Sequence, residues 1–215
     1  MTHIYAFGSI CRGDFDCDSD VDLLAITDHF DSRFSPEIFS IYSYQRLQEL
    51  WSEGNPFAWH LSTESKLLFA ENSQDFLETL GQPQSYKNRR IDCHKFCNLF
   101  QSAWNSVLGN RQSLVFDLGT MFLAIRNYAT CFSLGVGNIP NFSRNSALCL
   151  GSKSAPISQR TFSVLLRSRI LSTRGHGEAP TRIEVDSVMH EAPLILTWMF
   201  KLLEEIDHER IQQSN

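Results

Sequence analysis

The sequence predicts an α/β (α+β) fold, in which a small mixed β-sheet is followed by a C-terminal helical bundle. Over residues 1–82, short apolar runs typical of strands alternate with helical patterns. From residue 90 onward, the apolar residues follow only the period of helices. The length of 215 residues suits one core domain and a smaller second one. We therefore expect domains at residues 1–82 and 90–215, joined by a linker.

The first half is expected to hold strands near 3–8, 21–27, 37–43 and 66–70, and helices near 44–53, 56–63 and 72–80. Gly54-Asn55-Pro56 separates the first two helices, and its proline suits the first position of the second one. Four longer helices are expected near 91–108, 112–134, 157–173 and 184–211. The second of these is expected to be deeply buried, because it carries Leu114, Phe116, Leu118, Met121, Phe122, Ile125, Tyr128 and Ala129.

The most informative segment combines a glycine turn with a pair of carboxylates. It contains, in order, Gly8-Ser9, Arg12-Gly13 and Asp20-Val21-Asp22. Side chains alternate along a strand, so Asp20 and Asp22 are expected to share one face while Val21 faces the core. Two carboxylates about 6 Å apart repel by about 3 kcal/mol at an effective dielectric near 20. A bound cation reverses that cost, so the pair is a candidate Mg²⁺ site.

The loop before this pair carries further acids, Asp14, Asp16 and Asp18, at a spacing that suggests a calcium loop. An EF-hand needs glycine at its sixth position and glutamate at its twelfth. Counted from Asp14, those positions hold Ser19 and Ala25. The calcium interpretation therefore fails, and the three acids are expected to lie in a solvated loop.

The pattern of Gly8-Ser9, Arg12-Gly13 and Ser19-Asp20-Val21-Asp22-Leu23 resembles the signature of the DNA polymerase β-like nucleotidyltransferase superfamily. It is similar in particular to the small bacterial branch of minimal and kanamycin-type nucleotidyltransferases, the latter with a helical C-terminal domain. The resemblance implies an enzyme that transfers a nucleoside monophosphate from an NTP or dNTP to an acceptor hydroxyl, with release of pyrophosphate.

For this chain, the resemblance implies that Asp20 and Asp22 are the catalytic residues and hold Mg²⁺ or Mn²⁺. Gly8, Ser9 and Arg12 are expected to contact the triphosphate. The chemistry agrees, because the transition state spreads negative charge over phosphate oxygens and is stabilised by positioned cations and donors. Gly8 has no Cβ to obstruct a close backbone approach. Aspartates supply the hard oxygen ligands that Mg²⁺ prefers.

The sequence departs from the family pattern at the third carboxylate, which the superfamily usually carries on a later strand. The strand expected near 37–43 has Ser40 and Tyr42 at its centre and no acid there. His60 and Glu64 are four residues apart and share a helical face. They are either a base and its orienting group or an ordinary helix pair. The missing acid is also the best support for an alternative function, an inactive fold that serves as an antitoxin or a scaffold for a partner protein.

Arginines in the second half are expected either to form salt bridges within the helical bundle or to bind the substrate. Arg126 is expected on an apolar helix face, where an unpaired charge costs several kcal/mol, so Asp117 or Glu191 is expected as its partner. Arg144 and Arg174 lie in or beside loops and are candidates for triphosphate or acceptor contacts.

Composition sets the remaining expectations. A net charge of −5 argues against a protein that coats duplex nucleic acid. The six scattered cysteines are typical of reduced thiols, and no long apolar span or leader is evident, so we expect a cytoplasmic protein with no membrane contact. The acceptor is a small molecule such as an aminoglycoside, a protein side chain or a nucleotide chain. A nucleotide signal in bacterial antiviral defence, a partner protein and a homo-oligomer remain open.

Overall fold

Four strands in the described part of the chain form one mixed sheet with the order β3-β2-β1-β4. They are β1 (Thr2–Phe7), β2 (Asp22–Thr27), β3 (Phe39–Tyr42) and β4 (Ser65–Ala70). β1 runs antiparallel to β2 and β4, and β2 runs parallel to β3. The computed structural model describes residues 1–14, 21–109, 112–136 and 140–213. The chain divides into an N-terminal unit, Met1–Lys87, and a C-terminal unit, Asn88–Asn215.

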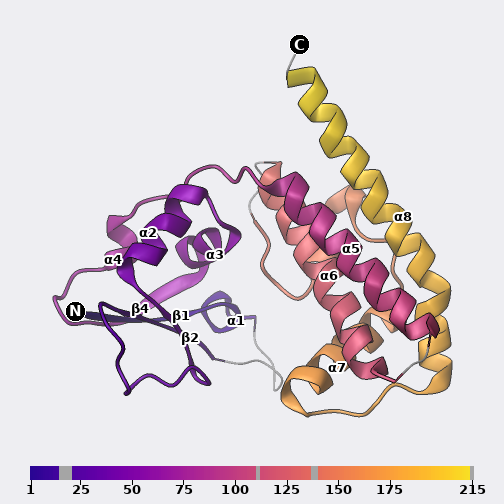
Figure 1. The fold of residues 1–215 in the computed structure, drawn as a ribbon, viewed down its shortest axis with the longest axis horizontal. Helices are drawn as coiled ribbons and strands as arrows, with labels where there is room; N and C mark the ends of the chain where they lie inside the picture. The colour runs from indigo at the N-terminus through magenta and orange to yellow at the C-terminus, as the bar shows by residue number, and fades with distance from the viewer. Residues whose placement is uncertain (15–20, 110–111, 137–139, 214–215) are drawn as a thin grey trace. The chain divides into compact units, whose positions relative to one another are not determined.

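Helices α2 (Tyr44–Glu53), α3 (Pro56–Glu64) and α4 (Phe76–Thr79) cover one face of this sheet (Figure 1). α1 (Ser9–Arg12) follows β1 and has no buried residue. The N-caps follow from the sequence, because the Ser43 hydroxyl accepts from the backbone N–H of Arg46 and the Asn55 side chain accepts from that of Phe57. The core between sheet and helices includes Tyr5, Leu24, Ile26, Leu47 and Leu61.

The start of the expected linker is attached to the N-terminal unit. The indole N–H of Trp51 donates to the carbonyl oxygen of Gly81 at 2.9 Å. The indole N–H of Trp59 donates to that of Gln84 at 3.1 Å. Residues 81–84 therefore lie against α2 and α3.

The C-terminal unit is helical, as predicted (Figure 1). Its helices are α5 (Arg89–Gly109), α6 (Leu114–Gly135), α7 (Gln159–Arg174) and α8 (Arg182–Gln213), with 3₁₀ turns at Ser146–Leu148 and Gly151–Lys153. α6 packs against both α5 and α7 and carries more of the described buried residues than any other helix, although Phe116 is 63% exposed, against expectation. None of the helices in the described ranges has the length and apolarity needed to cross a bilayer.

The expected partner of Arg126 is corrected by the structure. Its guanidinium donates to the carbonyl oxygen of Phe142 at 2.8 Å. Asp117 accepts instead from the Ser106 hydroxyl at 2.8 Å, and Glu191 accepts from groups at the N-terminus of α7. The sequence analysis considered only acidic side chains as partners, so it did not predict a hydrogen bond to a backbone carbonyl in the segment after α6.

Close packing between α6 and α7 depends on Gly119. A Cβ at this position would lie 2.7 Å from the Ser172 hydroxyl and 3.0 Å from the Cα of Arg169. We expect Gly119→Ala to lower the free energy of unfolding by about 1–3 kcal/mol, because the backbone of α7 must shift. Gly109 ends α5 and has no atom within 4 Å of the same position, so Gly109→Ala is a matched control with no expected loss. Urea unfolding measures both, and equal values would contradict the packing argument.

Glu184 closes the first turn of α8. Its carboxylate accepts from the backbone N–H and the hydroxyl of Thr181 and from Arg167, at 2.8, 2.9 and 2.9 Å. The Glu184 backbone N–H lies 3.4 Å from the Thr181 hydroxyl, which completes a capping box. The bond from the Thr181 backbone N–H, then those from its hydroxyl and from Arg167, lower the pKa of Glu184 to about 2.

The lowered pKa of Glu184 predicts how the free energy of unfolding depends on pH. A carboxyl whose folded pKa lies below its ordinary value of 4.5 stabilises the fold above that pH and loses the contribution as pH falls toward 2. Glu184→Gln keeps a capping side chain but removes the charge. We expect wild type to exceed this variant in free energy of unfolding at neutral pH, with the difference shrinking between pH 4.5 and 2. Exposed Glu178, changed to Gln, is the control, and a difference independent of pH would refute the assignment.

Candidate active site

The register of the sheet brings three segments to one edge. Phe7, the last residue of β1, pairs with Asp22 at the start of β2 and with Ser65 at the start of β4. Gly8 follows Phe7 and Glu64 precedes Ser65. Gly8, Asp22 and Glu64 therefore lie at the same edge of the sheet, although the first and the last are 56 positions apart in the sequence.

Gly8 and Asp22 are in close approach at this edge. The backbone of Gly8 has φ +77° and ψ −144°, a conformation that residues with a Cβ rarely adopt. A Cβ there would lie 2.5 Å from Oδ2 of Asp22. The sequence analysis expected Gly8 to leave room for the triphosphate, and the structure shows that it leaves room for a carboxylate. Asp22 is exposed, so this carboxylate faces solvent at the edge of the sheet.

α1 is a single helical turn that begins at Ser9 and ends at Arg12. The carbonyl oxygen of Gly8 accepts from the backbone N–H groups of Cys11 and Arg12 at 3.1 and 3.2 Å. Ser9, a predicted triphosphate contact, is half-buried at the start of the turn, directly after Gly8. The sequence analysis expected only a glycine turn here.

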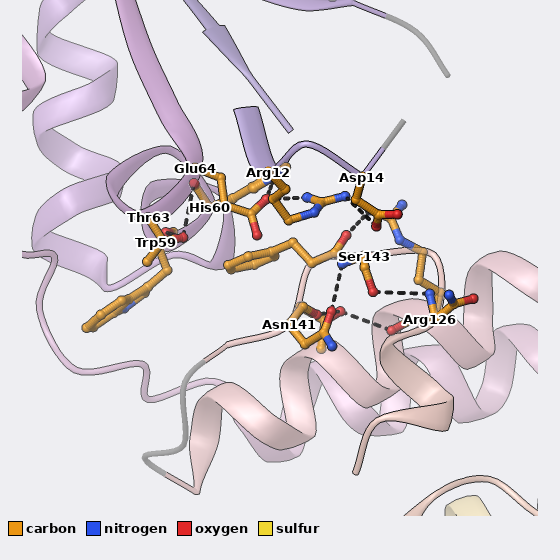
Figure 2. Close-up of polar contacts among 12 residues, drawn as sticks. Arg12, Asp14, Trp59, His60, Thr63, Glu64, Arg126, Asn141 and Ser143 are labelled. Atoms are coloured by element: carbon orange, nitrogen blue, oxygen red, sulfur yellow. Dashed lines mark hydrogen bonds and ion pairs between the residues drawn. The ribbon is translucent and has the colours of Figure 1, made fainter. Parts of the chain in front are cut away.

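The side chain of Arg12 forms ion pairs rather than lying open to solvent. Figure 2 shows it directed toward Glu64 on one side and Asp14 on the other. Its guanidinium forms an ion pair with the Glu64 carboxylate and lies 3.9 Å from that of Asp14. His60 Nε2 lies 2.9 Å from the same Glu64 oxygen. His60 and Glu64 therefore form a helix pair on α3, and Arg12 joins it as a third member.

This network keeps Glu64 ionised. The Glu64 side chain is only 10% exposed, and burial by itself raises the pKa of its carboxyl. The nearby His60 and Arg12 side chains outweigh burial, and the pKa lies below its ordinary value. At neutral pH the site therefore contains a carboxylate that is paired with the Arg12 guanidinium and lies 2.9 Å from His60 Nε2.

The other predicted site residues have different outcomes. Asp20, the second predicted metal ligand, lies outside the described residues. Val21 was expected to face the core and is 55% exposed, because β2 begins only at Asp22 and the core starts at Leu24. Asp14 is exposed, as expected for a solvated loop.

No acid stands on β3 beside this edge. β3 pairs Ser40 with Leu24 and Tyr42 with Ile26, so both face the same side of the sheet as Asp22. Within the described ranges, no three His, Cys, Asp or Glu side chains gather in a metal-binding cluster.

Residues 2–81 match the family model described as Nucleotidyltransferase domain, and the match spans β1 to β4. The N-terminal unit contains a nucleotidyltransferase domain. The match confirms the resemblance to the polymerase β-like superfamily, while the minimal or kanamycin-type branch stays a prediction. None of the curated proteins matches the chain. A nucleotidyltransferase domain indicates nucleotidyl transfer from a nucleoside triphosphate, generally with a divalent metal ion.

The sequence analysis missed the contact between Arg12 and Glu64 in this nucleotidyltransferase domain. The two residues are 52 positions apart, and no local pattern links them. The one available signal was the strand pairing, because antiparallel β1 and β4 bring the residue after one strand beside the residue before the other.

The close approach of Gly8 and Asp22 predicts different costs for two glycine substitutions. Gly8→Ala should lower the free energy of unfolding by more than about 2 kcal/mol, because it adds a clash with Asp22 to the strain of positive φ. Gly13 has φ +74° with no atom within 4 Å of a Cβ, so Gly13→Ala carries only the strain, about 1 kcal/mol. Urea unfolding compares them, and equal costs would rule out the clash.

Proposed function

We propose that the chain is a metal-dependent nucleotidyltransferase that transfers a nucleoside monophosphate from an NTP or dNTP to an acceptor hydroxyl. The observation that supports it best is the Asp22 carboxylate lying against the Cβ-less backbone of Gly8, next to the turn that begins at Ser9. An acid and the turn that we propose to bind phosphate therefore lie at one edge of the sheet, within a nucleotidyltransferase domain.

The residues at this edge fit a hard divalent cation. Asp22 offers carboxylate oxygens on an exposed edge, and carboxylates are the ligands that Mg²⁺ and Mn²⁺ prefer. In the proposal, Asp20 and Asp22 hold the ion. When bound, it neutralises charge on the phosphate oxygens and on the leaving pyrophosphate.

The remaining roles follow from the turn. The Ser9 hydroxyl binds oxygens of the triphosphate, and Gly8 allows the backbone to approach them. The acceptor oxygen forms a bond to the α-phosphorus, the bond from that phosphorus to pyrophosphate breaks, and the hydroxyl proton leaves to a base. Arg12 was expected to contact phosphate, but it is paired with Glu64, and we assign it another role below.

The acceptor has three candidate classes: a small molecule, a protein side chain and a nucleotide chain, the last including a nucleotide signal in antiviral defence. The competing function is a binding module that has lost activity. It is favoured by β3, which carries Ser40 and Tyr42 where the superfamily usually has a third acid.

The test is pyrophosphate release from each NTP and dNTP with Mg²⁺ or Mn²⁺. We expect metal-dependent release that falls at least about 100-fold in Asp20→Ala/Asp22→Ala, the scale seen when an electrostatic contact to a transition state is lost. Asp28 is exposed and lies just beyond the opposite end of β2, so Asp28→Asn is the matched control and should retain activity.

The mass of the labelled product identifies the acceptor class. Triphosphate binding that needs the metal, without turnover, would indicate that the acceptor is missing from the assay. Absence of triphosphate binding under all conditions would overturn the enzyme proposal and favour the binding module.

A further inference from the structure

Glu64 contacts both ends of the turn that carries Ser9. Its backbone carbonyl oxygen accepts from the N–H of Gly8 at 3.2 Å, just before the turn. Its carboxylate pairs with Arg12, the last residue of the turn (Figure 2). Glu64, the last residue of α3, therefore holds the four-residue turn α1 at both of its ends.

In the described part of the chain, the core contributes little to holding this turn. α1 contains four residues and none of them is buried, so it gains no core packing. A helix of this length is not stable by itself, because nucleation costs more than its few hydrogen bonds return. The pair between Arg12 and Glu64 is partly shielded, with side-chain exposures of 20% and 10%, and charge-assisted bonds are stronger in such surroundings.

The Glu64 carboxylate is itself held in place. His60 Nε2 lies 2.9 Å from the oxygen that binds Arg12. The His60 ring packs edge-to-face on Phe7, with 5.5 Å between ring centroids. Phe7 pairs with Asp22 in the sheet. The anchor therefore has a fixed position relative to the strand that carries the proposed metal ligand.

We propose that Glu64 is a positioning residue, which fixes the turn from Gly8 to Arg12 through the Arg12 guanidinium and so presents Ser9 to the triphosphate. This inference rests on the proposed function for its last step. In it, Arg12 clamps the turn, and Glu64 touches neither the nucleotide nor the metal. Supporting groups of this kind hold the turn in its binding conformation before the substrate arrives, so less conformational entropy is lost on binding.

The first test is amide hydrogen exchange on the full chain, which needs no turnover. We expect residues 9–14 to exchange about tenfold faster in Glu64→Ala and in Arg12→Ala, and no faster in the double variant than in either single one. The exposed pair of Arg46 and Glu49 on α2 provides the control, Glu49→Ala, which should leave this segment unchanged. Unchanged exchange across α2 and β2 shows that the variants are folded. Wild-type exchange of residues 9–14 in Glu64→Ala would overturn the proposal.

The second test separates positioning from general structural support. In the pyrophosphate assay, we expect Glu64→Ala to raise KM for the NTP about tenfold and to lower kcat less than threefold. Glu64→Gln keeps an oxygen that accepts from Arg12, so it should recover most of the KM. Faster exchange with unchanged KM would overturn the link to the triphosphate. If wild type neither releases pyrophosphate nor binds the triphosphate, the proposed function fails, and exchange still decides the role of Glu64.

Discussion

The N-terminal unit depends on the backbone conformation of Gly8. At this residue β1 ends and α1 begins, and a positive φ makes the change of direction within one position. Three features follow from it: the Gly8 carbonyl oxygen starts α1, its N–H binds Glu64, and its missing Cβ admits the Asp22 carboxylate. A residue with a Cβ would strain this backbone and clash with the Asp22 carboxylate.

The site is built where elements end, not inside them. Asp22 begins β2, Glu64 ends α3, and Arg12 ends α1. The core fixes the ends of β2 and α3, since Leu24 and Leu61 are fully buried a few residues from Asp22 and Glu64. Rigid elements thereby position groups that are themselves partly solvated, which suits a site for a charged, soluble substrate.

Much of the fold and part of the site were predictable, because they depend on local patterns. The caps Ser43 and Asn55 follow from adjacent residues, and so does the motif around Gly8. β2 does not follow the expected alternation, because four consecutive residues from Leu24 to Thr27 are buried. α1 was missed because four unburied residues carry no periodicity. Contacts such as Arg12 with Glu64, or Arg126 with the Phe142 carbonyl, depend on three-dimensional placement that no local pattern encodes.

The geometry also bears on the choice between an enzyme and a binding module. A glycine at a strand end costs about 0.5–1 kcal/mol of conformational entropy relative to alanine, and the Asp22 carboxylate packed against it leaves no room for a Cβ. Neither is needed to fill the core, because Asp22 is exposed and no residue of α1 is fully buried. A fold that served only as a scaffold would gain stability by losing both. Their presence together, with Glu64 holding the turn beside them, favours a site that is still used for phosphate chemistry.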